Sequence, residues 1–240
     1  MEVRLDDKAA LVTGAGRGIG RAIAKALATC GAHVVLAART KRQIDAVAAQ
    51  IASAGGKATP VVADVSDEQS VARLFDEVRR LGRLDVLVNN AGIGRYGPLK
   101  DFSAEDFDGV VGTNLRGTFL CCREAMGIMV PQKSGYIINI SSVVGLKGYP
   151  DQAAYTASKH GVVGLTKSLA VEAQEHGIRV SVIMPGGVDT DLVGDARPDL
   201  DRSELLKGED IAQTVLYLLS LSDRAAVDQI YIRRRAAKPF

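Results

Sequence analysis

The sequence contains no tryptophan and only three cysteines among its 240 residues, Cys30, Cys121 and Cys122. A small and odd number of cysteines excludes a disulfide framework. Cys121 and Cys122 are adjacent within a helical pattern, so they cannot both face one site. We interpret all three as small apolar side chains in a reducing compartment, within a domain whose 47% hydrophobic content can form a sizeable core without cross-links.

Long hydrophobic runs are also absent. No stretch approaches the ~18 consecutive apolar residues that a membrane-spanning helix needs. The first eight residues lack the charged and then apolar pattern of a secretory signal. The sequence therefore predicts no membrane association and a cytoplasmic location.

The sequence has almost no excess of one charge sign, because 30 Lys and Arg residues nearly balance 28 Asp and Glu residues and leave a net charge of +2. This balance is too mild to indicate binding to nucleic acid or to an anionic membrane. The only basic run, Arg233-Arg234-Arg235, is interpreted as a solvated tail. The three histidines, His33, His160 and His176, are far apart in the sequence, and no cluster has metal-ligand spacing, so no metal site is expected.

What the sequence does contain is a regular alternation of short apolar runs and longer helical patterns. The apolar runs predict strands at residues 9–12, 33–38, 58–63, 85–88, 136–140, 179–184 and 226–232. The helical patterns cover residues 21–29, 44–54, 71–81, 103–130, 153–174 and 211–219. Strands that alternate with helices and have continuous apolar cores predict a single α/β domain over residues 1–240, a doubly wound parallel sheet with helices on both faces.

A glycine-rich turn, Thr13-Gly14-Ala15-Gly16-Arg17-Gly18-Ile19-Gly20, joins the first strand to the first helix. Glycines let the backbone approach a pyrophosphate, and a helix N-terminus offers unpaired N–H groups and partial positive charge. The G-x-x-x-G-x-G spacing differs from both the G-x-G-x-x-G fingerprint and the P-loop. Such a turn can also be purely structural, so by itself it is weak evidence for a dinucleotide.

The end of the second predicted strand indicates which dinucleotide. A site for NAD usually has an acid there, about 20 residues after the glycine turn, to bind the ribose 2′-hydroxyl. This sequence has Ala38 followed by Arg39. A 2′-phosphate needs a cation, and Arg17 in the glycine turn offers a second one. The pattern favours NADP(H), with two ordinary surface arginines as the alternative.

Two further strand ends carry polar or small residues. Asp64-Val65 follows the third strand, where the carboxylate either accepts from an adenine amino group or caps the helix that starts near Asp67. Asn89-Asn90-Ala91-Gly92 follows the fourth strand, and small residues there admit a ligand. Alone, this second segment is more often a turn than a site.

The segment from Asn139 to His160 carries the strongest chemical signal. Ser142 ends a strand, and Tyr155 and Lys159 are four apart on a helix, so the phenol and the ammonium share a face. Tyrosine has an ordinary pKa of ~10, and a pKa of ~7 needs about 4 kcal/mol of preferential stabilisation of the phenolate. A fixed cation and a hydrogen bond can supply this stabilisation. The segment predicts proton transfer at a carbonyl or alcohol oxygen. The alternative is structural: Ser142 would cap a strand end, Tyr155 would be a packed aromatic, and Lys159 would be a surface cation.

The two longest predicted helices are apolar around most of their circumference. Residues 103–130 begin at Ser103, a predicted N-cap with Asp106 in capping-box position, and contain Asn114. Residues 153–174 contain Gly161 and Gly164. A helix that is apolar on two sides must be buried on two sides. With one side on the sheet, the other predicts contact with a second subunit, in a homodimer or homotetramer.

Together these segments resemble the short-chain dehydrogenase/reductase family, over nearly the whole chain. The matching residues are Thr13-Gly14 through Gly20, Asn89-Asn90-Ala91-Gly92, Asn114, Ser142, Tyr155-Thr156-Ala157-Ser158-Lys159 and Pro185-Gly186. The resemblance implies a Rossmann-type sheet of about seven strands, with NADP(H) lying over its carboxyl edge. The cofactor-binding residues it implies, together with the arginines above, are Gly14, Gly16, Arg17, Gly18, Ile19, Arg39, Asp64, Val65, Asn90, Ala91, Gly92, Tyr155, Lys159, Pro185, Gly186, Val188 and Thr190.

The same resemblance implies a catalytic role for four residues. Tyr155 would be the general acid in reduction and the base in oxidation, and Lys159 would bind the nicotinamide ribose and lower the tyrosine pKa. Ser142 would donate a hydrogen bond to the substrate oxygen. Asn114 would hold a water in a proton relay behind Lys159.

The substrate is less defined by this resemblance. The body of the chain is most similar to 3-oxoacyl-acyl-carrier-protein reductases, whose carrier-docking basic residues at the active-site mouth correspond to Lys133 and His176 here. The C-terminal segment is more similar to small-molecule carbonyl and sepiapterin-type reductases. An acyl thioester and a small ketone or alcohol therefore both remain open, with residues 94–96, 146–149 and 192–206 expected to decide. The alternative class is a non-catalytic NADP(H)-sensing protein on the same fold.

Overall fold

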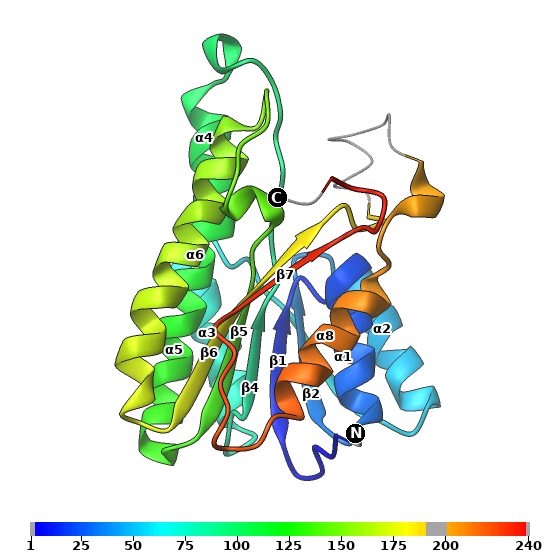
Figure 1. Cartoon of the computed structure of the whole chain (residues 1–240). Coiled ribbons are helices and arrows are strands. Elements are labelled where there is room, and N and C mark those ends of the chain that lie inside the picture. The colour runs from blue at the N-terminus through cyan, green and yellow to red at the C-terminus, as the bar shows by residue number, and fades with distance from the viewer. Residues whose placement is uncertain (1–2, 191–200, 239–240) are drawn as a thin grey trace.

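The computed structural model describes residues 3–190 and 201–238, and it forms one seven-stranded parallel sheet between two layers of helices (Figure 1). The strands are β1 (Ala9–Thr13), β2 (His33–Ala38), β3 (Lys57–Val62), β4 (Val86–Asn89), β5 (Gly135–Ile140), β6 (Ile178–Gly186) and β7 (Gln229–Arg233). The helices are α1 (Gly18–Thr29), α2 (Lys41–Ser53), α3 (Glu68–Arg79), α4 (Ala104–Val111), α5 (Gly117–Gln132), α6 (Ala153–Gln174) and α8 (Gly208–Leu219). The α/β fold predicted from the alternating pattern is confirmed.

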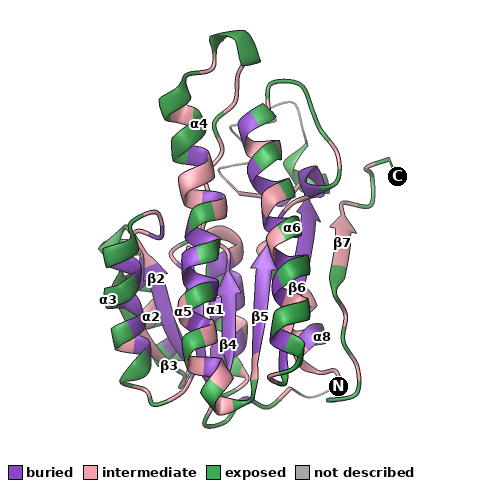
Figure 2. Ribbon diagram, turned by 90° about the vertical axis from the view of Figure 1, so that its left-hand side faces the viewer, coloured by how far each residue is buried: buried purple, intermediate pink, exposed green. Residues whose placement is uncertain are grey.

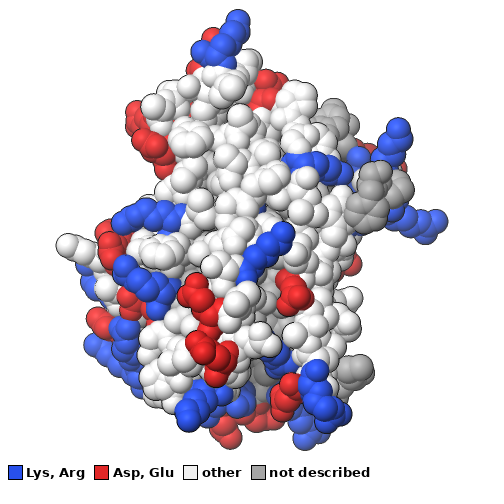
Figure 3. Space-filling model, turned by 60° about the vertical axis from the view of Figure 1, so that its left-hand side comes forward, with Lys and Arg blue, Asp and Glu red and all other residues white. Residues whose placement is uncertain are grey.

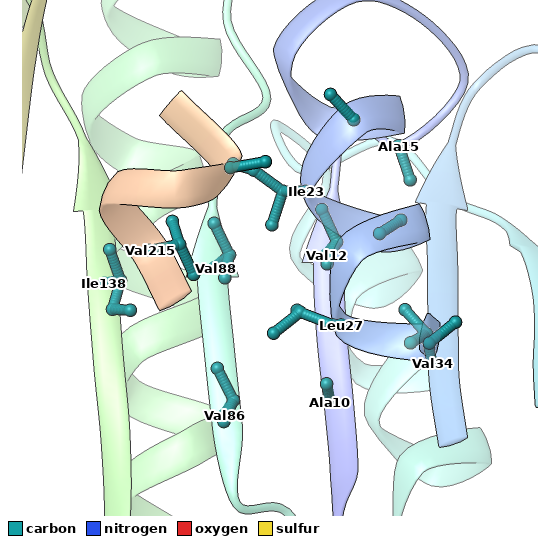
Figure 4. Close-up of a cluster of buried hydrophobic side chains, with 14 of the residues drawn as sticks. Ala10, Val12, Ala15, Ile23, Leu27, Val34, Val86, Val88, Ile138 and Val215 are labelled. Carbon is teal, nitrogen blue, oxygen red and sulfur yellow. The ribbon is translucent and has the colours of Figure 1, made fainter. Parts of the chain in front are cut away.

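The two faces of the sheet hold separate apolar cores because side chains alternate along each strand. Ala10 and Val12 of β1 point to the side covered by α1, α2 and α8, and Figure 4 shows this cluster. Leu11 points to the side covered by α3, α5 and α6. Both faces of the central strands are buried, which explains their uninterrupted apolar sequence.

The strand order is β3-β2-β1-β4-β5-β6-β7, so the chain reverses its direction of travel between β1 and β4. In open parallel sheets, ligands bind outside the carboxyl ends of the strands at such a reversal. The glycine turn after β1 and the Asn89-Asn90-Ala91-Gly92 segment at the end of β4 are therefore side by side. Pro60, which has no N–H to donate, is tolerated because β3 lies at the edge and pairs only with β2.

The structure corrects several element boundaries. The helix predicted for residues 103–130 is two helices, α4 and α5, joined by a π-helical turn from Gly112 to Arg116. Helix α1 begins within the glycine turn, and β6 extends to Gly186. The N-cap prediction at the start of α4 is confirmed, since Ser103 Oγ accepts a hydrogen bond from the Asp106 N–H at 3.0 Å.

None of the helices in the described residues is both long and apolar enough to cross a membrane. Cys121 and Cys122 are buried on the inner side of α5, and Cys30 is partly buried after α1. Burial raises the pKa of the Cys122 thiol to about 12, which fits the interpretation of these cysteines as apolar core residues.

Asp85 organises the amino-terminal edge of the sheet between β1 and β4. Its carboxylate accepts hydrogen bonds from the Ala9 N–H at 2.9 Å and from the Arg83 guanidinium at 2.7 and 2.6 Å, and Lys8 lies 3.2 Å away. Burial alone would raise the pKa of Asp85, but these partners outweigh it and lower the pKa.

Replacing Asp85 with Asn is expected to destabilise the fold by about 1–3 kcal/mol at pH 7, because two cations lose a buried partner. A lowered pKa in the folded state stabilises the protein above the unfolded pKa of ~3.9, and this contribution disappears as the pH falls through the folded pKa. The difference between the variants should therefore shrink in acid. Denaturant unfolding at pH 7 and at a pH below the unfolded pKa tests this. Asp45→Asn is the control, because the Asp45 side chain is 42% exposed.

Candidate active site

A cavity of about 830 Å³ opens along the carboxyl ends of the strands. Its size lies within the range of small-molecule and cofactor sites. It is lined by every residue that the sequence predicted to bind the cofactor, and by Ser142, Tyr155 and Lys159. Asn114 is the one predicted site residue that does not line it. Segments separated by more than 200 residues in sequence thus share one cavity.

The glycine turn fits a pyrophosphate. Gly14 has a φ of +65° and Gly18 a φ of +54°, conformations that favour glycine. A Cβ on Gly14 would lie 2.9 Å from the Ala91 Cα atom, so no larger residue fits there. Arg17, the N-cap of α1, makes no side-chain capping bond, and Gly18 and Ile19 of the first helical turn line the cavity.

Asn90 holds this turn in place from the neighbouring strand. Its side-chain amide donates to the Thr13 and Gly14 carbonyls at 2.9 and 3.2 Å. Thr13 Oγ1 accepts from the backbone N–H groups of Asn90 and Ala91 at 3.0 and 3.1 Å. The residue implied as a neighbour of the adenosine ribose therefore also fixes the shape of the glycine turn.

Arg39 and Asp64 lie together at the far end of the cavity, with Arg39 Nη1 3.9 Å from Asp64 Oδ2. Burial opposes ionisation of Asp64, but hydrogen bonds from Ser66 and the Arg39 charge lower its pKa overall. The capping alternative for Asp64 is wrong, because Asp67 caps α3 by accepting from the Gln69 N–H. Asp64 instead accepts from the Ser66 N–H and hydroxyl at 2.9 and 2.7 Å.

Ser142, Tyr155 and Lys159 meet at the opposite end of the cavity. Ser142 follows β5, and the other two project from the first turns of α6. Lys159 Nζ lies 5.7 Å from the centre of the Tyr155 ring and donates to the Ile140 carbonyl at 2.9 Å. Burial lowers the pKa of Lys159 to about 8. The side chain is therefore a cation at neutral pH, held beside the phenol by the end of β5.

The pKa of Tyr155 moves opposite to the sequence expectation. Burial raises it to about 12, and hydrogen bonding with Ser142 acts in the lowering direction. The reason is that burial destabilises the phenolate, while the Lys159 ammonium is directed at the Ile140 carbonyl. A protonated phenol at neutral pH suits a residue that donates a proton. Tyr96 packs edge-on against the Tyr155 ring at 5.9 Å between centroids and restricts its orientation.

Asn114 is buried and does not line the cavity, but it contacts residues that do. Its side chain accepts from the Ile93 N–H at 2.8 Å and donates to the Ile93 carbonyl and Ser158 Oγ at 2.9 and 3.0 Å. It therefore ties the segment after β4 to α6. A Cβ on Gly92 would lie 3.2 Å from Asn114 Oδ1 and 3.6 Å from Lys159 Nζ, which places the asparagine next to the lysine.

The C-terminal basic run is not a solvated tail, which corrects the sequence interpretation. Arg233 and Arg234 are partly buried and line the cavity, and only Arg235 of the three is exposed. Arg233 donates to the carbonyls of Arg234, Arg235 and Ala237, and Arg234 pairs with Glu204 at 3.3 Å. The sequence could not show this, because it depends on β7 pairing beside β6.

Lys133 and His176 are also placed differently from the expectation. Each precedes a strand, β5 and β6 respectively, so both lie at the amino edge of the parallel sheet. Ser142 follows β5 at the carboxyl edge. Neither residue is at the mouth of the cavity in this chain. Within the described residues, no group of histidines, cysteines and carboxylates could hold a metal ion.

Residues 8–201 match the model of the short chain dehydrogenase family. The chain belongs to this family. Its members are oxidoreductases that act on alcohol and carbonyl groups, and this chain is such an enzyme.

Several relatives align over most of the chain. A 3beta-hydroxysteroid dehydrogenase of Mediterraneibacter gnavus is 44% identical over 199 residues, which are 82% of this chain and 72% of that one. A 3-oxoacyl-(acyl-carrier-protein) reductase of Synechocystis sp. is 42% identical over 221 residues, 89% and 90% of the two chains. A metagenomic short-chain oxidoreductase solved in complex with NADP has a TM-score of 0.86 and 37% identity, covering 97% of this chain and 99% of its own. Their names differ in substrate, so the similarity alone selects none.

Proposed function

We propose that the protein is an NADP(H)-dependent oxidoreductase that transfers a hydride between nicotinamide and a carbonyl or alcohol carbon, with Tyr155 as general acid and base. The observation that carries this proposal is one cavity with two chemically distinct ends. One end has the glycine turn and Arg39, and the other has Ser142, Tyr155 and Lys159. The relative solved with NADP supports the choice of cofactor.

The cofactor, when bound, supplies the hydride to the carbonyl carbon. In reduction, Ser142 donates a hydrogen bond to the substrate oxygen and holds it beside the phenol. Tyr155 gives its hydroxyl proton to that oxygen, and the adjacent Lys159 cation stabilises the phenolate left behind. Oxidation reverses each transfer. Gly14, Gly18 and the first N–H groups of α1 hold the pyrophosphate, and Arg39 binds the 2′-phosphate.

A small ketone is the substrate class that we place first. Lys133 and His176, the pair expected to dock an acidic carrier protein, are at the edge of the sheet opposite Ser142. A 3-oxoacyl thioester is the second candidate, because relatives that align over 89% of the chain are named as 3-oxoacyl reductases.

The decisive experiment follows NADPH absorbance with ketones, diketones and a 3-oxoacyl thioester, each repeated with NADH. Reduction with a preference for NADPH is the expected result. Tight NADPH binding without turnover on any compound would favour the alternative, a non-catalytic sensor.

We also propose that the chain forms a homo-oligomer through α4, α5 and α6. These helices belong to one outer layer of the molecule, and their outward sides are exposed (Figure 2). Three apolar side chains, Phe107, Phe119 and Val171, are among the exposed ones. Val171 on α6 is 74% exposed. In a view between those of Figures 1 and 2, residues other than Lys, Arg, Asp and Glu cover much of the upper surface (Figure 3). A surface with few charges that carries exposed apolar side chains is typical of a protein interface.

Sedimentation at micromolar concentration is expected to show a dimer or tetramer. Phe119→Glu should shift the distribution toward the monomer, because a carboxylate would be buried in the interface. Val62→Glu, at a similarly exposed position on β3, is the matched control and should leave the distribution unchanged. A wild-type monomer would refute the proposal.

A further inference from the structure

The cavity is far more basic than the protein as a whole. In the described part of its wall, eight Lys and Arg side chains face two carboxylates, whereas the chain has 30 and 28. Three of the cations belong to the nucleotide end and one is Lys159. The other four are Lys147 in the connection between β5 and α6, Arg202 before α8, and Arg233 and Arg234 at the end of β7. This second group exceeds what a dinucleotide alone requires.

Most of these four cations are already engaged. Arg202 pairs with Asp189 and Arg234 with Glu204, at 2.5 and 3.3 Å. Arg233 is occupied by three backbone carbonyls of the C-terminal turn. Lys147 is different, because its neighbours are rings and hydroxyls and no described carboxylate pairs with it.

Lys147 is held by two tyrosines from distant parts of the chain. Its Nζ atom lies 5.8 Å from the ring centres of both Tyr149 and Tyr231. Hydrogen bonding to the Tyr231 hydroxyl, and more weakly to Tyr149, raises the pKa of Lys147. The ammonium therefore stays charged at neutral pH. Neutral partners position it without neutralising its charge, and the side chain is only partly exposed.

Lys147 lies in the same cavity as the proposed catalytic groups Ser142 and Tyr155. It belongs to the connection between β5 and α6, which contains Ser142 and leads into the helix that carries Tyr155. All three side chains line the same cavity. Tyr231 and Arg233 are two apart on β7 and point to one face of the sheet, so β7 supplies the opposite wall.

We propose that Lys147 binds a carboxylate of the substrate, so that the preferred substrates are oxo acids or hydroxy acids. This inference rests on the proposed reductase function and names its substrate class. A single positioned ammonium with neutral neighbours matches one monoanionic group, and it forms a charge-assisted hydrogen bond there. The carboxylate fixes one end of the substrate while Ser142 and Tyr155 take the carbonyl oxygen at the other.

The test uses the full-length protein with NADPH and linear oxo acids of increasing chain length, each compared with its methyl ester. The best acid should exceed its ester by about tenfold or more in kcat/KM. Lys147→Met should remove this preference, mainly through a higher KM for the acid, and leave the ester within about twofold. Lys147→Arg should restore much of the preference. Lys25→Met, at an exposed position on α1 outside the cavity, is the matched control.

Equal activity on acid and ester, or equal losses on both in Lys147→Met, would overturn the inference and leave Lys147 as a structural link between the two tyrosines. Calorimetric titration of the acids, with and without NADP⁺, separates this result from failure of the reductase proposal. Binding that disappears in Lys147→Met without any turnover would reject the reductase and keep the carboxylate site. An absence of binding and of turnover in the wild type would reject both.

Discussion

Replacement of Tyr155 by phenylalanine is expected to lower kcat by about 10²–10⁴-fold, because the substrate oxygen loses its proton donor. The ring would still fit between Tyr96 and the Lys159 side chain, so the cavity should keep its shape. NADPH affinity should therefore change little. Stopped-flow measurement of the hydride step, together with a titration of NADPH binding, separates the chemical effect from a loss of cofactor.

Tyr217→Phe is a suitable control, because this tyrosine is half exposed on α8 and outside the cavity. It should retain wild-type kinetics. Near-normal turnover in Tyr155→Phe would contradict the assigned role and return Tyr155 to the alternative of a packed aromatic. A matching loss of NADPH binding would show that the variant had disturbed the site as a whole.

The parts of the molecule that depend on local sequence were predictable. The central strands, which contain Leu11 and Leu87, are buried on both faces of the sheet. Their apolar runs are therefore continuous and easy to recognise. Tyr155 and Lys159 are neighbours through helical spacing alone. The glycine turn is also local, because Gly14 and Gly18 adopt positive φ values within one connection.

Features that depend on long-range packing were not predictable. The π-helical turn that presents Asn114 leaves no clear mark in the helical pattern of residues 103–130. The raised pKa of Tyr155 follows from burial by surrounding elements, which spacing on one helix does not report. Lys147 meets Tyr231 only because β7 pairs with β6, and the same pairing brings Arg233 into the cavity. The sequence thus predicted that Ser142, Tyr155 and Lys159 lie together, but it did not predict the residues of β7 that line the same cavity.

Arg39 depends on both local sequence and long-range packing. The sequence predicts it as the cation for a 2′-phosphate, and the structure shows that Asp64 lies beside it. Its guanidinium lies 3.9 Å from the Asp64 carboxylate, and the Arg39 side chain is 64% exposed at the end of the cavity. With Arg39 present, the carboxylate is partly neutralised, and the remaining N–H groups are available to a phosphate. Without Arg39, the Asp64 carboxylate would lose its ion-pair partner, and a 2′-phosphate would lose its cation at this end of the cavity.

Arg39→Ala is therefore expected to lower kcat/KM with NADPH by about 10- to 100-fold, mostly through KM, since a charge-assisted bond is lost. Activity with NADH should stay within about threefold, because NADH has no 2′-phosphate for Arg39 to bind. Steady-state kinetics with both cofactors measures the ratio. Arg42→Ala removes an exposed arginine three residues along that does not line the cavity, and it should leave the ratio unchanged. Parallel losses with NADH and NADPH, or a wild-type preference for NADH, would show that Arg39 does not select the phosphorylated cofactor.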